Sequence, residues 1–161
     1  KMDTFADNFS EVSYDQGDYY FKMIYYIFDR FNNHGNKGGD RINIFNTDVR
    51  ISKKNYNIEH LNPRNPKNNL YDISLDEDRD YINSLGNLLV VSSHANSKAG
   101  NDSISEKIEK VYKNSLKLST VRDFVESFNA KDWETKEGIF KSIEKRKNDM
   151  TIIAYKNIWA L

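Results

Sequence analysis

The segment 55–63, NYNIEHLNP, decides both the fold and the function that the sequence indicates. Asn55–Glu59 is a short run that favours an extended strand, and it leads directly into His60. Pro63 prevents a helix from starting immediately afterwards, because proline lacks an amide hydrogen and restricts the residue before it. Neighbouring strand residues point to opposite faces, so Glu59 and His60 can share one site only if the strand ends or bends there. We therefore expect the first strand to end at this pair.

A second strand and a helix complete the predicted core. Asn87–Ser92 (NLLVVS) is short, consists mainly of aliphatic and β-branched residues, and follows Gly86, a turn residue. Ser103 and Glu106 have the spacing of a capping box, which opens a helix. Strand, long loop, strand and helix predict an α+β fold with its core at about 55–113.

The segments around this core predict helices separated by loops. Apolar residues at three-four spacing in 15–31 predict a buried helix, whose aromatic residues we interpret as core rather than as platforms for stacked bases. Further helices are predicted at Thr120–Phe128 and Asp132–Leu161. The remaining segments are predicted as a loop at Asn32–Asp40, a weak short strand at Ile42–Phe45, and a long loop at Asn62–Leu85 in which the acidic stretch Asp76–Asp80 is solvated or opens one helical turn.

Length and composition restrict the classes of protein. The 161 residues, 38% of them hydrophobic, suffice for one core, so 1–161 is expected to be a single domain. Lys plus Arg (24) equals Asp plus Glu (24), so any contact with nucleic acid depends on a local patch. The absence of cysteine excludes disulfides and thiolate metal sites. Without an apolar span or a signal pattern, we expect a soluble cytoplasmic protein and no membrane partner. The polar stretch Lys1–Asp18 suggests a fragment of a longer protein, although Met2 could be a start.

The residues of the predicted core have a chemistry in common. Hydrolysis of a phosphodiester needs a base that activates water and a cation that offsets the charge on the phosphate. His60 can be neutral and basic at cellular pH. Glu59 and Asn96 offer oxygen ligands of the kind that Mg²⁺ or Mn²⁺ prefers. The plainer alternatives are a solvated Glu59 and an Asn96 that caps a helix.

The ordered set of these residues resembles a known family. The runs Ile58–Pro63, Leu85–Leu89 and Asn96–Lys98 are similar to the HNH-like nuclease domain at the C-terminus of GmrSD-type modification-dependent restriction enzymes. Lys107 lies where that family usually has a lysine. Arg146 and Trp159 fit its C-terminal helix. The resemblance runs from about Tyr20 to the end of the chain.

This resemblance implies a ββα-metal (HNH) core embedded in a mainly helical domain, and a role for each matching residue. His60 would be the general base, and Asn87 the middle asparagine that bonds the backbone of the loop holding the histidine. Glu59 and Asn96 would bind one divalent ion, with Mg²⁺ expected and Mn²⁺ possible. The family nicks or cuts DNA, so the resemblance implies that this chain is a metal-dependent endonuclease or nickase of a restriction or anti-phage defence system. Its relatives commonly sit behind an N-terminal ParB-like nucleotidase domain.

Three points stay open at the level of the sequence. The third histidine of many relatives is missing, and His94 could be a metal ligand, a phosphate contact or a surface residue. Lys98 and Lys107, with Lys110, could contact DNA or belong to a solvated helix face. The same fold could also serve as a DNA-binding module that has lost cleavage, or as a helical partner-binding domain. His34 is expected at the surface.

Overall fold

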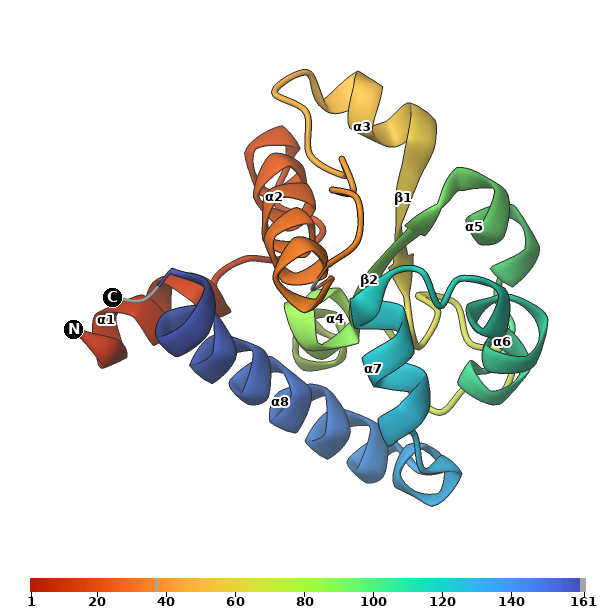
Figure 1. Ribbon diagram of the computed structural model, residues 1–161. Helices are drawn as coiled ribbons and strands as arrows, with labels where there is room; N and C mark the ends of the chain where they lie inside the picture. The colour runs from red at the N-terminus through yellow and green to blue at the C-terminus, as the bar shows by residue number, and fades with distance from the viewer. Residues whose placement is uncertain (37, 160–161) are drawn as a thin grey trace.

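The computed structural model describes residues 1–36 and 38–159, and its centre is a two-stranded antiparallel sheet surrounded by helices (Figure 1). β1 (Tyr56–His60) pairs with β2 (Leu88–Ser92), and His60 lies opposite Leu88 at the end of the ladder. Both strands lie where the sequence predicts them. The mainly helical α+β class is therefore confirmed.

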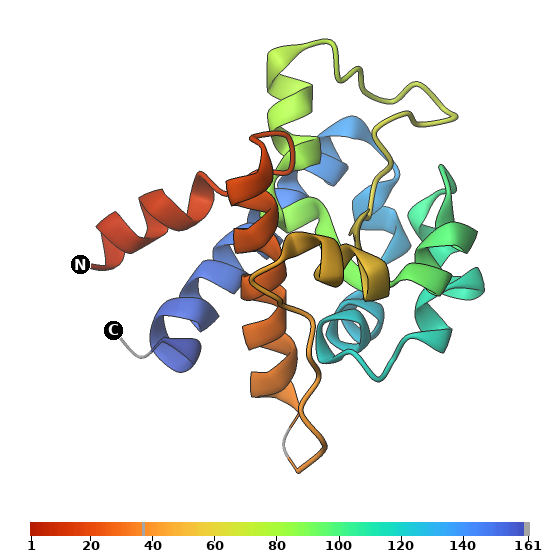
Figure 2. The ribbon, with the colours of Figure 1, turned by 90° about the horizontal axis from the view of Figure 1, so that it is seen from above.

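Helices pack around both faces of this sheet, and the view from above shows α1 beside the last turns of α8 (Figure 2). Throughout the described ranges, no helix has the length and apolar character needed to cross a membrane. In chain order the helices are α1 (Met2–Ser10), α2 (Asp18–Gly35), α3 (Val49–Asn55), α4 (Asp76–Asn83), α5 (Ser93–Ala99), α6 (Ile104–Lys110), α7 (Ser119–Ser127) and α8 (Lys136–Ile153). Short helical turns are η1 (Leu85–Asn87), η2 (Tyr112–Asn114), η3 (Ala130–Trp133) and η4 (Ala154–Ile158).

The long helix α8 holds the turn that precedes β2. A Cβ atom on Gly86 would lie 2.0 Å from the carbonyl oxygen of Ile143, so only glycine allows α8 to approach this closely. Arg146 Nη1 donates to the carbonyl oxygens of Leu85, Gly86 and Leu88 at 3.2, 2.8 and 2.8 Å. The residues Leu88–Val91 that follow are fully buried in the main hydrophobic core. Gly86 is thus required by packing as well as by the turn.

Two predictions in the first third of the chain are wrong. The predicted loop Asn32–Asp40 begins too early, because α2 continues to Gly35: Asn32 Nδ2 bonds the Phe28 carbonyl, and Asn32 Oδ1 accepts from the backbone N–H of Thr120. Ile42–Phe45 forms no strand. The backbone N–H groups of Ile44 and Phe45 bond the Asp29 carboxylate instead of a neighbouring strand.

Several helix boundaries also differ from those predicted. The acidic stretch Asp76–Asp80 opens the two-turn helix α4 inside the predicted long loop, and α1, α3 and α5 are helices that the sequence does not predict. The C-terminal helix begins at Lys136, after the cap Thr135, rather than at Asp132, and residues 160–161 of that prediction lie outside the described part. The capping box of Ser103 and Glu106 is confirmed at the start of α6.

Candidate active site

His60 is held at the end of β1 and is largely covered. Its side chain is 9% exposed, and the Tyr14 ring lies edge-on with its centroid 4.4 Å from that of the imidazole. His60 Nε2 lies 3.2 Å from Asn83 Oδ1. In the orientation that the structure gives the Asn83 amide, its oxygen faces the imidazole and can only accept, which assigns the proton to Nε2 and the lone pair to Nδ1. The arrangement leaves one imidazole nitrogen able to accept a proton.

Burial keeps this histidine neutral. The pKa of His60 is lowered to about 4, chiefly by desolvation; the charges of Arg64 and Lys107 also lower it, while the bond to Asn83 and the charge of Asp15 oppose the shift. At neutral pH the imidazole is therefore uncharged and can act as a base.

Asn87 fixes the backbone that follows His60. Its Oδ1 accepts from the backbone N–H of Asn62 at 2.9 Å and from Asn62 Nδ2 at 3.2 Å. Its Nδ2 donates to the carbonyl oxygens of Asn62 and Ile82 at 3.0 and 2.8 Å. Asn87 is fully buried, so these bonds are shielded from water. This geometry is the backbone support that the resemblance implied for Asn87.

Glu59 points to the other side of β1, where its partner is a lysine. Lys107 Nζ donates to Glu59 Oε1 at 2.5 Å and to the His60 carbonyl oxygen at 2.6 Å, and the Tyr112 hydroxyl donates to the same carboxylate at 3.3 Å. Burial raises the pKa of Glu59, although Lys107 and Tyr112 pull it down. Lys107 is 1% exposed. The prediction that Lys107 contacts DNA is therefore corrected, since its ammonium lies in the interior and ties α6 to β1.

The other predicted ligands lie on α5, and in the described residues none of them bonds Glu59 or Lys107. The Asn96 amide is half-buried, and its Nδ2 lies 3.3 Å from the side-chain amide of Asn57 on β1. His94 and Lys98 are exposed. Hence α5 presents one amide, one imidazole and one ammonium, while the carboxylate of the predicted set is bound elsewhere.

This arrangement does not fit a divalent ion held by Glu59, His94 and Asn96. The Glu59 carboxylate already neutralises a buried ammonium, and a metal ligand has to be free to donate its oxygen. In residues 1–36 and 38–159, no three His, Cys, Asp or Glu side chains are grouped to hold a metal ion. The metal site stays a prediction of the sequence.

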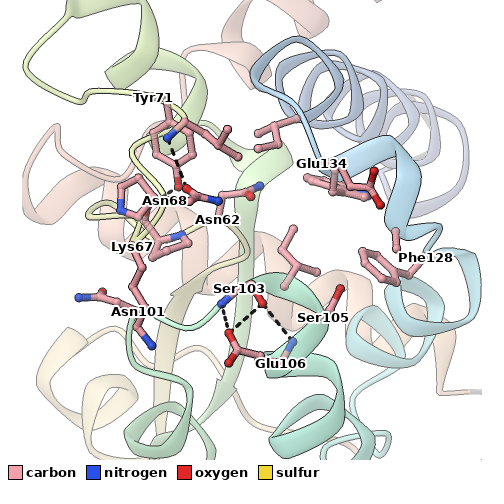
Figure 3. Close-up of a pocket in the computed structure, with 17 residues that line it drawn as sticks. Asn62, Lys67, Asn68, Tyr71, Asn101, Ser103, Ser105, Glu106, Phe128 and Glu134 are labelled. Carbon is pink, nitrogen blue, oxygen red and sulfur yellow. Dashed lines mark hydrogen bonds between the residues drawn. The ribbon is translucent and has the colours of Figure 1, made fainter.

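A cavity of about 400 Å³ opens beside the loop after β1 (Figure 3). The loop contributes Asn62, Lys67 and Tyr71, and the opposite wall comes from the start of α6 and from Phe128. Tyr71 donates its hydroxyl to the Pro63 carbonyl oxygen, which fixes the proline turn. Asn62 thus bonds Asn87 and also lines this cavity.

Sequence reasoning missed Tyr14, Arg64 and Asn83. Asn83 ends α4 and reaches His60 across 23 residues, and the backbone N–H of Tyr14 donates to the Asn83 carbonyl oxygen at 2.9 Å. Arg64 lies over the Tyr14 ring at 5.7 Å. No motif or periodicity marks these residues, because the contacts join segments that are distant in the chain.

Comparison with known proteins identifies the family of this chain. A family model described as the C-terminal domain of the GmrSD restriction endonucleases matches residues 1–153. The match defines the class as a domain of the restriction-endonuclease type. The chain belongs to the GmrSD C-terminal domain family, which confirms the resemblance seen in the sequence. No curated protein and no solved structure matches the chain.

Proposed function

We propose that this domain hydrolyses phosphodiester bonds in DNA by HNH-type chemistry, with His60 as the general base. The observation that carries the proposal is the His60 imidazole, which is neutral, held through Nε2 by Asn83, and attached to a backbone that Asn87 fixes. A base held in one orientation needs little reorganisation at the moment of reaction. Family membership supports the same chemistry.

The proposed step is an in-line displacement. His60 Nδ1 takes a proton from water as the water oxygen forms a bond to phosphorus, and the bond from phosphorus to the 3′ oxygen breaks. The products carry a 5′ phosphate and a 3′ hydroxyl, whose proton comes from solvent. A phosphodiester anion beside His60 favours the imidazolium, so substrate itself strengthens this base.

The remaining expectations from the resemblance are part of the proposal. Cleavage would depend on Mg²⁺ or Mn²⁺, although no step above relies on the ion. Lys98, which is exposed on α5, stays a predicted DNA contact. The domain would act as the effector of a cytoplasmic restriction or anti-phage defence protein, covalently linked to an N-terminal ParB-like nucleotidase domain.

Plasmid topology tests this function. The protein is incubated with supercoiled plasmid and Mg²⁺ or Mn²⁺, with EDTA, His60→Ala and His34→Ala as controls. His34 is a matched control because it is an exposed histidine on α2. Open-circular or linear DNA that disappears with EDTA and with His60→Ala, but persists with His34→Ala, supports the proposal. Equal cleavage by His60→Ala would show that the base is another residue.

A binding module without cleavage is the second candidate. Two observations favour it: Tyr14 covers His60, and Lys107 occupies the Glu59 carboxylate. This candidate predicts a shifted band on a gel with plasmid or duplex DNA, and plasmid that stays supercoiled with every divalent ion.

A further inference from the structure

A cluster of aromatic and basic side chains surrounds the covered face of His60. The Tyr14 ring contacts the imidazole, and the Phe21 ring meets Tyr14 edge-on with centroids 5.1 Å apart. Arg64 lies over Tyr14, while Lys53 Nζ lies 4.5 Å from the Phe21 centroid. These residues come from the segment before α2, from α2, from α3 and from the loop after β1. We call them, together with His60, the Tyr14 cluster.

Arg64 has hydrogen-bonding capacity that the protein leaves unused. Its Nε atom is buried and has no hydrogen-bond partner in the described residues. Within the same ranges, no carboxylate lies at ion-pair distance from its guanidinium, which rests on an aromatic ring instead. Buried N–H donors are normally satisfied, so an unpaired one favours a ligand that accepts a hydrogen bond.

Asn83 offers a second unpaired donor at the same place. Its side chain is fully buried, its Oδ1 binds His60, and its Nδ2 finds no partner among the residues described. The two side chains with unpaired donors are linked through the adjoining rings of Tyr14 and His60, because Arg64 lies over the Tyr14 ring and Asn83 bonds the imidazole. Donors of this kind suit an anionic oxygen, and guanidinium in particular suits phosphate.

Lys53 extends the positive charge away from His60. It is exposed on α3, and its ammonium lies over Phe21 rather than beside a carboxylate of the described chain. The overall charge of the protein is zero, so contact with a polyanion has to come from such a local concentration of cations.

We propose that a DNA strand crosses the Tyr14 cluster, with Arg64 and Asn83 contacting the phosphate beside His60 and Lys53 contacting a neighbouring phosphate. The inference rests on the proposed function, because it places the DNA substrate beside His60, the proposed base. The Tyr14 ring contacts both Arg64 and His60, so it has to shift when the phosphate enters. Arg64 is then a catalytic residue, whereas Lys53 only positions the strand.

Salt dependence of DNA binding tests the surface separately from catalysis. Affinity for a fluorescent duplex oligonucleotide is measured against salt concentration in the His60→Ala background, in which the probe stays intact. Each phosphate contact adds about 0.9 to the slope of log affinity against log salt. In this background, Arg64→Ala and Lys53→Ala should each reduce the magnitude of the slope by about one. Arg122→Ala on α7 and Lys113→Ala on η2, which are paired with Asp123 and Glu109, serve as matched controls and should leave it unchanged.

Each result decides for or against the cluster. Unchanged slopes for Arg64→Ala and Lys53→Ala, or no binding to the duplex at low salt, would overturn the proposal. Reduced slopes support it, even if plasmid is never cut, in which case only the hydrolytic function fails. If the protein cuts plasmid, Arg64→Ala should lower kcat by about 100-fold or more, since it removes a contact to the reacting phosphate. Arg64→Lys should restore part of that loss, and a thermal melt of each variant verifies that it is folded.

Discussion

Lys107 Nζ lies 2.5 Å from Glu59 Oε1, and this buried ion pair joins α6 to the strand end that carries His60. The same ammonium binds the His60 carbonyl oxygen. Lys107, with these two buried acceptors, holds the backbone of His60 from one side, and Asn87 holds the residues that follow from the other.

Removing the lysine alone should destabilise the fold strongly. Lys107→Met leaves the buried Glu59 carboxylate without its charged partner, with only the Tyr112 hydroxyl bonded to it, which should lower the free energy of unfolding by about 3–5 kcal/mol. The double variant Glu59→Gln/Lys107→Met should recover most of this loss, because it removes both charges. Urea denaturation measures both values. If the free energy of unfolding of Lys107→Met lies within about 1 kcal/mol of the parent's, the ion pair contributes little to stability.

Divalent ions should not stabilise the protein in the absence of DNA. Since Lys107 already neutralises Glu59, Mg²⁺ or Mn²⁺ finds no prepared carboxylate, and the Tm should stay constant as the ion is titrated. In Lys107→Met the carboxylate loses its partner, and the ion should raise the Tm. A saturable rise in the parent would mean instead that Glu59 leaves Lys107 for the metal.

His60 should make stability depend on pH. Its pKa is lowered to about 4 in the folded chain and is about 6.5 when unfolded, so the unfolded state takes up the proton first. The contribution of His60 is fully present above about pH 6.5 and is lost as the pH falls toward 4. Between about pH 7.5 and pH 5, the free energy of unfolding of the parent should fall by about 2 kcal/mol more than that of His60→Gln, whose side chain does not titrate. If chemical denaturation shows the same fall in free energy for the parent and for His60→Gln, His60 is not buried in its neutral form.

Asn87 should matter for the base as well as for stability. Asn87→Ala removes the bonds to Asn62 and Ile82, which should lower the free energy of unfolding by about 2–3 kcal/mol. It should also lower cleavage, because the loop after His60 loses its support. Asn65→Ala, at an exposed position of the same loop, should change neither quantity. Normal cleavage by a folded Asn87→Ala would separate this residue from the catalytic site.

Local signals explain what the sequence predicts well. The β2 strand follows from a run of aliphatic residues, β1 ends near Pro63, and the capping box of Ser103 starts α6. Each of these depends on residues that are neighbours in the chain. The support given by Asn87 entered through the family resemblance, and its bonds to Asn62 agree with that expectation.

Contacts between distant segments account for what the sequence could not show. Glu59 and Lys107 are 48 residues apart, so nothing local indicates that the carboxylate meets a lysine rather than solvent. The same holds for His60 and Asn83, which join β1 to the end of α4. The burial of His60 depends on Tyr14, from a segment whose polar composition gave no reason to place it beside the site.

The three backbone bonds of Arg146 have a consequence for when activity can arise. A ribosome that has made residues 1–135 has already made His60, Asn83 and Asn87, but not the α8 helix that carries Arg146. Until α8 docks on Gly86, the turn before β2 lacks the bonds that hold it in place. The growing chain therefore gains the full support of this turn, and of the sheet end that carries His60, only after the α8 helix has been made.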